Sequence, residues 1–282
     1  MGRAETLAQT LLAQVTAQTR PADRVLICAT APSDVAGIDL ASYGAAVFMD
    51  AAPSTTGQRN RLLAAAEGCD IVAFFDDDFM PEPGYLAAID RSFSAVPDIA
   101  VATGVVLADG AKGPGLTPDE ARAALAAAPS CTPAALRDVF NAYGCNMVVN
   151  LARLAPAGTR FDERLPLYAW YEDIDFSRRA AKFGRIVRMP DARGVHLGVK
   201  RGRTSGVRLG YSQVINPIYL WRKGTYPFSH VLHSVGRHTL INAIRALRPE
   251  SHIDRAGRLR GNAHGFADLL RGHIDPERVK AL

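Results

Sequence analysis

An apolar run of strand length, residues 70–75 (DIVAFF), leads directly into the three aspartates Asp76, Asp77 and Asp78. Five consecutive apolar residues suit a buried β-strand better than a helix, which needs about ten or more residues. In an open α/β sheet, ligands gather at the carboxyl ends of the strands. The run therefore predicts a buried sheet with negative charge at one edge.

Strand-like and helix-like patterns alternate around this run. Strands are expected over 24–30, 45–49, 70–75 and 99–107, and helices over 4–18, 57–67 and 85–93. This alternation favours an α/β fold with an open, mostly parallel sheet flanked by helices. The remaining segments are a loop-and-helix insertion over 109–140 and a C-terminal stretch with more turns, followed by helices around 230–247 and 263–270.

Charge is divided unevenly along the chain. Residues 1–196 carry 18 Lys and Arg against 23 Asp and Glu, whereas residues 197–282 carry 15 against 5. The C-terminal part therefore either meets an anionic partner or presents a solvated basic face. Nucleic acid is not expected as that partner, because no recognised binding motif or aromatic platform is present. The helix expected over 230–247 could instead contact an anionic membrane or pack on the rest of the protein.

Features that would direct the chain into or across a membrane are missing from the sequence. No window approaches the roughly 18 to 20 apolar residues of a membrane span, and residues 1–10 lack the pattern of a secretory signal. The four cysteines (Cys28, Cys69, Cys131 and Cys145) are far apart, which argues against a thiolate zinc site or a disulfide framework. We expect a cytoplasmic protein, and peripheral contact at the inner face of the membrane stays one of the two alternatives for the helix over 230–247.

The aspartate cluster indicates a metal site. Adjacent carboxylates repel one another strongly unless a cation lies among them. In an extended segment Asp76 and Asp78 point to the same face. Mn²⁺ and Mg²⁺ favour carboxylate oxygens and often share them with substrate phosphates. The alternative is a polar loop tip whose aspartates cap the following turn, and we favour the metal.

A second acidic cluster, Glu172-Asp173, opens a predicted helix and follows Trp170-Tyr171. Acids at a helix start are also favoured by capping and by the helix dipole, and the two aromatic residues could stack on a sugar or belong to the core. His196 ends a short predicted strand over 190–196. Neutral imidazole is a common metal ligand, although a lone histidine is more often structural.

Basic residues at two places suit phosphate binding. Arg59-Asn60 lies near the start of the predicted helix over 57–67, and Lys200, Arg201 and Arg203 lie in a Gly-rich loop. Surface ion pairs and a solvated loop are the alternatives. The sequence contains neither a dinucleotide fingerprint nor a phosphate loop of the P-loop type, so dehydrogenase and P-loop NTPase functions have no support.

Taken in order, these pieces resemble glycosyltransferase family 2, whose members share the GT-A fold. The resemblance covers about residues 3–200, through Arg59-Asn60, IVAFFDDDFMPEPGYL, GCNMVVN, FDERLPLYAWYEDIDFSRRAAKFG and MPDARGVH. It implies a GT-A-like catalytic domain over 1–200 and a basic, mainly helical extension over 201–282. The last third is more weakly similar to tails of bacterial exopolysaccharide glycosyltransferases. The strand that opens the family's fold has no counterpart before Arg3.

The resemblance also implies roles for individual residues. Asp76 and Asp78 match the family's D-x-D motif, which contacts the ribose and the metal, and His196 matches a histidine that completes the metal shell. Asp173 matches the general base. Further substrate-binding residues are expected at Arg59, Asn60, Gly144, Asn146, Trp170 and Glu172.

The sequence therefore predicts a metal-dependent, inverting glycosyltransferase that uses Mn²⁺ or Mg²⁺. It would move a sugar from a nucleotide diphosphate donor to a hydroxyl of a glycan or lipid-linked acceptor, in cell-surface or exopolysaccharide synthesis. Two alternatives stay open. A nucleotidyltransferase could use a related sheet and acidic metal site, and a non-catalytic protein that binds nucleotide sugars could retain the same residues.

Overall fold

The computed structural model describes residues 3–50, 53–130, 134–199, 205–248 and 250–282, and it divides into two compact units. The sheet unit comprises Met1–Ala52, Gln58–Arg160 and Arg179–Gly202, and the helical unit comprises Pro53–Gly57, Phe161–Arg178 and Arg203–Leu282. The ranges expected from the sequence, 1–200 and 201–282, differ from this division mainly over residues 161–178, which group with the C-terminal helices.

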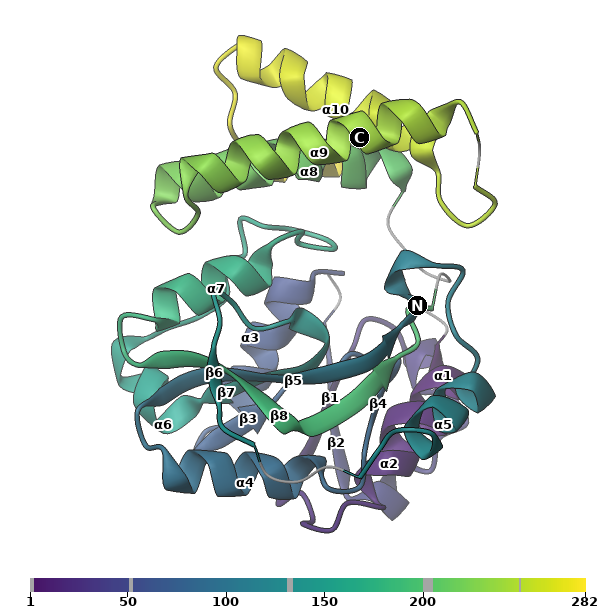
Figure 1. Ribbon diagram of the computed structural model, residues 1–282, viewed down its shortest axis with the longest axis vertical. Helices are drawn as coiled ribbons and strands as arrows, with labels where there is room; N and C mark the ends of the chain where they lie inside the picture. The colour runs from purple at the N-terminus through teal and green to yellow at the C-terminus, as the bar shows by residue number, and fades with distance from the viewer. Residues whose placement is uncertain (1–2, 51–52, 131–133, 200–204, 249) are drawn as a thin grey trace. The chain divides into compact units, whose positions relative to one another are not determined.

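The strands of the sheet unit form two sheets (Figure 1). They are β1 (Val25–Ala29), β2 (Ala45–Met49), β3 (Ile71–Ala73), β4 (Phe79–Pro81), β5 (Ile99–Asp109), β6 (Arg137–Asp138), β7 (Met147–Asn150) and β8 (Arg185–His196). Strands β1 and β2 pair with each other. The other six form a sheet of order β3-β7-β5-β8-β4, and β6 pairs with β8.

Strand directions in the larger sheet are mixed, whereas the sequence predicted a mostly parallel sheet. The parallel pairs are β1–β2 and β5–β8, and the other four pairs are antiparallel. Every antiparallel pair involves β4, β6 or β7, strands of two to four residues that pattern analysis did not detect. Apolar patterns report burial rather than direction, so only the longer strands and their parallel pairing were predictable.

Helices of the sheet unit are α1 (Ala4–Leu7), a π-helical turn (Ala8–Leu12), α2 (Ala13–Val15), α4 (Tyr85–Ala95), α5 (Pro118–Ala126) and α6 (Leu151–Leu154). Helix α3 (Thr55–Ala65) lies mostly in the sheet unit, and α7 (Glu172–Ala180) lies mostly in the helical unit. Short 3₁₀ turns cover Pro32–Asp34, Leu40–Tyr43, Gly110–Lys112, Gly144–Asn146, Ala155–Ala157 and Pro276–Ala281. Helix α4 packs on β8 and buries Tyr85, Ile89 and Phe93 in the core.

Close packing of β5, β8 and α4 depends on Gly104. A Cβ atom at this position would lie 2.3 Å from the Ala192 carbonyl oxygen and 2.4 Å from the Tyr85 hydroxyl, so no larger residue fits without movement. In the same pair of strands Asp109 is the register partner of His196. The tight β5–β8 pairing therefore fixes two polar side chains at the carboxyl ends of neighbouring strands.

Three long helices, α8 (Gly206–Lys223), α9 (Phe228–Ala246) and α10 (Arg255–Leu270), pack together in the helical unit (Figure 1). The sequence analysis expected turns where α8 lies, because glycine and proline are poor helix formers. Packing explains the glycines. A Cβ atom at Gly210 would lie 2.0 Å from the Arg258 carbonyl oxygen, and one at Gly261 would lie 2.0 Å from that of Val207. The backbones of α8 and α10 thus touch, and this contact overrides local propensity.

Polar contacts explain why residues 161–178 group with the C-terminal helices. The Lys223 ammonium pairs with Asp162 and lies 2.8 Å from Asp175 Oδ2, and the Thr225 hydroxyl donates to Asp175 Oδ1 at 2.9 Å. Asn216 Nδ2 donates to the backbone carbonyl oxygen of Trp170 at 2.8 Å. The C-terminal helices therefore hold the segment that leads into α7. Among the helices of the described residues, none is long and apolar enough to cross a membrane.

Candidate metal centre

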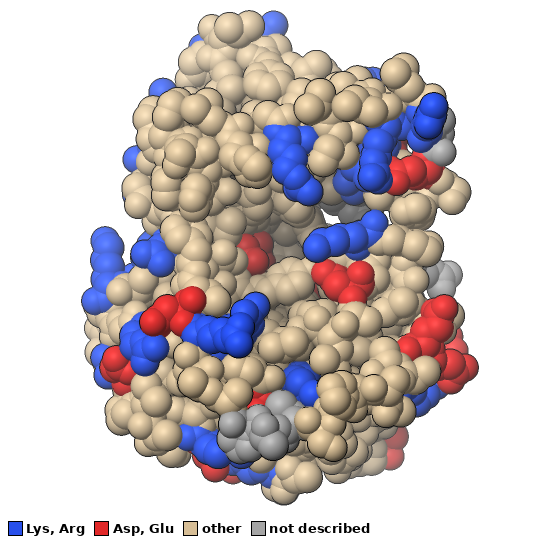
Figure 2. Space-filling model, viewed as in Figure 1, with Lys and Arg blue, Asp and Glu red and all other residues tan. Residues whose placement is uncertain are grey.

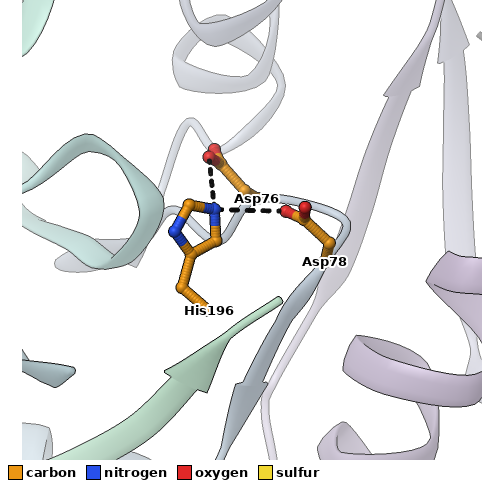
Figure 3. Close-up of side chains that lie close together, drawn as sticks. All are labelled: Asp76, Asp78 and His196. Atoms are coloured by element: carbon orange, nitrogen blue, oxygen red, sulfur yellow. Dashed lines mark ion pairs between the residues drawn. The ribbon is translucent and has the colours of Figure 1, made fainter. Parts of the chain in front are cut away.

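Asp76, Asp78 and His196 come together in the sheet unit (Figure 3). The two aspartates follow β3, and His196 is the last residue of β8, which pairs with β4 so that Phe79 lies opposite His196. His196 Nε2 is 4.0 Å from Asp76 Oδ2 and 3.5 Å from Asp78 Oδ1. One ligand atom from each side chain fits within 4.8 Å of the others, which is compatible with a single divalent cation.

Asp78 is buried and ionised. Its Oδ2 atom accepts a hydrogen bond from the Val199 N–H at 2.7 Å and lies 2.7 Å from Arg3 Nη2. Burial alone would raise its pKa, but the hydrogen bond with His196, the nearby positive charges and the Val199 N–H together lower the pKa to about 2. The Oδ1 atom faces His196, so this aspartate offers a charged ligand atom at neutral pH.

Asp77 has a different environment from its two neighbours. Its Oδ1 atom lies 2.8 Å from Arg3 Nη2. Burial raises the pKa of Asp77 to about 7, against the opposing effect of the Arg3 charge. Arg3 therefore bridges Asp77 and Asp78. A bound cation was expected to offset the repulsion among the aspartates, and in the structure Arg3 supplies part of that positive charge.

His196 is oriented by Asp109 at the end of β5. His196 Nδ1 lies 2.9 Å from Asp109 Oδ1, which also accepts the Ala111 N–H at 2.9 Å, and the Tyr143 hydroxyl donates to Asp109 Oδ2 at 3.2 Å. Burial disfavours charge on the imidazole, but Asp109 and Asp78 outweigh it and raise the pKa of His196 to about 10. With Nδ1 donating to Asp109, Nε2 is the nitrogen that faces the aspartates.

Arg59 and the segment that begins at Gly144, both expected to bind the donor, lie beside Asp76. Arg59 is buried, donates from Nη2 to the Gly144 carbonyl oxygen at 2.8 Å, and lies 3.5 Å from Asp76 Oδ1. The Asp76 N–H donates to the Cys145 carbonyl oxygen at 3.1 Å. Asn146 is fully buried and accepts from the Thr103 hydroxyl at 2.6 Å, while Asn60 follows Arg59 on α3. The roles of these residues in donor binding stay predictions.

The segment that carries Trp170, Glu172 and Asp173 belongs to the helical unit. The Trp170 ring stacks on Tyr171 at 5.1 Å, and Glu172 and Asp173 open α7. Three non-glycine residues just before α7 have left-handed backbones, with φ of 59° at Leu167, 53° at Ala169 and 76° at Tyr171. Such conformations cost about 1–3 kcal/mol each and cluster at functional sites. The catalytic roles of this segment stay predictions.

Sequence analysis did not assign Arg3, Asp109 or Tyr143 to the site. Asp109 could have been found, because it follows the strand expected over 99–107 just as Asp76 follows its own strand. Arg3 and Tyr143 carried no comparable signal, since they reach the site from a helix start and a loop. Lys200, Arg201 and Arg203, which we considered for diphosphate binding, lie outside the described residues.

Comparison by sequence gives no match to any protein-family model or to any curated protein. Comparison by structure gives clear matches. The mannosyltransferase PcManGT from Pyrobaculum calidifontis, solved with GDP-Man and Mn²⁺, is 18% identical, with 99% of this chain and 75% of that chain covered and a TM-score of 0.54. S. aureus TarS 1-349 is 15% identical, with 100% of this chain and 80% of that chain covered and a TM-score of 0.58.

A third similar structure is GalNAc-T7, solved with UDP, GalNAc and Mn²⁺. It is 14% identical, with 95% of this chain and 54% of that chain covered and a TM-score of 0.54. These glycosyltransferases have the GT-A fold, so the fold class predicted from the sequence is confirmed. At these identities the likeness establishes the fold, and the activity must be argued from the site.

Proposed function

We propose that this protein is a metal-dependent glycosyltransferase that moves a sugar from a nucleotide diphosphate donor to a hydroxyl acceptor. The observation that carries the proposal is the Asp76, Asp78 and His196 group at the end of β3 and β8 in a GT-A fold. Ligands of open α/β sheets bind at this edge. Two structural neighbours, solved with Mn²⁺ together with GDP-Man or UDP, support the same reading.

The donor atoms suit Mn²⁺ or Mg²⁺. Two carboxylates and one imidazole form a mixed oxygen and nitrogen set of the kind that Mn²⁺ accepts, and Mg²⁺ is held in proteins by few carboxylates together with substrate phosphates. The Asp76 side chain is 42% exposed, so the group is open to a donor diphosphate. When bound, the ion would neutralise charge that develops on the departing nucleoside diphosphate.

Residues of the chain would supply the rest of the chemistry. Arg59 holds the Gly144 carbonyl oxygen and lies next to Asp76, so it would fix the loop that receives the donor. Asp173 would accept the proton of the acceptor hydroxyl as this attacks the anomeric carbon, with inversion. General-base assistance of this kind contributes roughly 10²- to 10⁴-fold. Glu172 and Trp170 would bind the acceptor sugar, and the left-handed backbone around them supports a functional role for this segment.

The finer parts of the proposal concern the acceptor and the location. The acceptor would be a glycan or lipid-linked sugar used in cell-surface or exopolysaccharide synthesis. A cytoplasmic location is supported by the free cysteines Cys28, Cys69 and Cys145, which suit a reducing compartment. Cell fractionation that recovers the protein with periplasmic or secreted markers would contradict this location.

A donor screen tests the proposal. The purified protein is incubated with individual nucleotide sugars and candidate acceptors, with Mn²⁺ or with EDTA, and released nucleoside diphosphate is measured. We expect release with at least one donor, loss of release in EDTA, and loss in Asp78→Asn. The matched control is Asp119→Asn, which removes an exposed carboxylate of α5 that pairs with Arg122.

Other outcomes of the same screen point to other functions. Pyrophosphate release from a nucleoside triphosphate, without diphosphate release from any sugar nucleotide, would identify a nucleotidyltransferase. Metal-dependent binding of a nucleotide sugar without turnover would identify a non-catalytic binding protein. Release that is unaffected by both EDTA and Asp78→Asn would refute the metal centre.

A further inference from the structure

Helix α9 has two apolar faces, and only one of them is buried. Val231 and Val235 pack inside the helical unit. On another face Leu232 is 61% exposed, Leu240 60%, Ile244 58% and Leu247 84%. We call these four residues the α9 ridge. Ile244 and Leu247 follow Leu240 at intervals of four and three residues, so these three line one side of the helix, whereas Leu232 lies two turns before Leu240 with Gly236 between them.

An aromatic pair continues the apolar surface at the start of α9. Trp221 is 43% exposed and Phe228 is 51% exposed, and their ring centroids are 5.1 Å apart. Phe228 precedes Leu232 by one helical turn, so the aromatic pair adjoins the N-terminal end of the ridge. Soluble monomers rarely expose large apolar patches unless the patch binds a partner. Here Leu240, Ile244 and Leu247 gather at one end of α9, and Trp221, Phe228 and Leu232 gather at the other.

Basic side chains border the ridge. Arg237 and Arg248 lie on α9 and just beyond it, and Arg222 is next to Trp221 in the sequence. All three are exposed, and within the described residues none of them forms an ion pair with an acidic side chain. Figure 2 shows Lys and Arg side chains on the visible face of the helical unit, in keeping with the 15 to 5 excess of basic residues over 197–282.

We propose that the α9 ridge and the Trp221–Phe228 pair form a docking surface for an anionic phospholipid bilayer. The helix would lie along the bilayer surface, with its apolar ridge among the upper acyl chains and its arginines on lipid phosphates. Arginine binds phosphate oxygens through a planar fork, and tryptophan is enriched at the boundary between lipid and water. This surface goes beyond the sugar-transfer reaction, because it concerns where the protein works.

Charge decides between a bilayer and a second copy of the chain. Two copies joined through the α9 ridge would bring Arg237 and Arg248 of each copy close to those of the other. Like charges at an interface oppose association. An anionic bilayer instead gains about 1 kcal/mol for each arginine near its surface, which corresponds to about five-fold in partition coefficient per residue.

Vesicle flotation with the full chain tests the surface without any donor or metal. We expect recovery with vesicles of phosphatidylcholine and phosphatidylglycerol, less recovery at high salt, and little with phosphatidylcholine alone. The double variant Leu240→Ser and Ile244→Ser should lower the partition coefficient by about ten-fold or more, because each buried aliphatic side chain contributes strongly. Met49→Ser, which changes an exposed apolar residue of β2, is the control and should bind normally.

Several results would overturn the proposal. They are absence of binding to the anionic vesicles, equal binding of the double serine variant with an unchanged circular dichroism spectrum, and equal binding to both vesicle types. Light scattering that shows a dimer, which the double serine variant converts to a monomer, would assign the ridge to self-association. The variant Arg237→Gln with Arg248→Gln should lose binding and keep its helices, so a folding defect is separated from a lost contact.

Discussion

Replacing Lys223 by methionine should loosen the segment that carries the proposed catalytic base. The Lys223 ammonium pairs with Asp162 and with Asp175, whose side chain is completely buried. Removing one partner of a buried ion pair costs about 3–5 kcal/mol, because the remaining charge cannot reach water. Lys223 is itself 24% exposed, so we take the lower end, about 3 kcal/mol. That value corresponds to about a hundred-fold in the equilibrium for local opening.

Hydrogen exchange followed by mass spectrometry measures this effect where it arises. Peptides across residues 161–178 should lose about a hundred-fold in protection, while peptides from α4 in the sheet unit keep theirs. Lys223→Arg should retain most of the protection, and Arg222→Met, which changes the exposed neighbour, should change nothing. If Lys223→Met left the protection of 161–178 within two-fold of the wild type, the anchoring role assigned to this lysine would be refuted.

Three further predictions follow from the site and the helical unit. Asp109→Asn should weaken Mn²⁺ binding about 10- to 100-fold in calorimetry, because the carboxylate that orients His196 is lost; unchanged affinity would contradict this. Asp173→Asn should lower kcat by about 10²- to 10⁴-fold with Mn²⁺ affinity unchanged, and full turnover would exclude Asp173 as the base. Burial, with the charges of Arg237 and Arg258, lowers the pKa of His238 to about 4. Between about pH 6.5 and 4 the unfolded chain then binds more protons than the folded protein. The buried neutral His238 therefore costs no stability above pH 6.5, and the free energy of unfolding falls as the pH drops toward 4. The free energy of unfolding from urea titrations, followed by tryptophan fluorescence, should fall by about 3 kcal/mol over that range, and His238→Gln should reduce the slope.

The longer elements of the fold were predictable because each has a period or an apolar run of its own. The strand expected over 24–30 is observed as Val25–Ala29, and the helix expected over 85–93 as Tyr85–Ala95. Short strands such as β4 and β7 are too brief to carry a pattern, and they supply antiparallel pairs that the sequence did not reveal. Helix α8 was missed for another reason, since its glycines are required by contact with α10 and not by local preference.

The candidate site was predictable where carboxylates or histidine end a recognisable strand. Asp76, Asp78 and His196 meet this description, and among the described residues their side chains lie close enough to hold one metal ion. Residues that act on these three were harder to find. Arg3, at the start of α1, forms an ion pair with Asp78. Tyr143, in a loop, donates a hydrogen bond from its hydroxyl to Asp109. Their contribution depends on distances across the fold, which a linear pattern does not contain.

The charges around Asp78 indicate what a bound metal would and would not do. Arg3 and the Val199 N–H already satisfy Asp78 Oδ2, and His196 faces Oδ1. Groups of the protein therefore offset part of the charge of the aspartate cluster before any cation binds. Asp76, Asp78 and His196 Nε2 would hold a divalent ion, and His196 would do so as the neutral imidazole, so metal binding should weaken at low pH. Removing the metal should then abolish donor binding and leave the sheet unit folded, which separates this centre from a structural metal site.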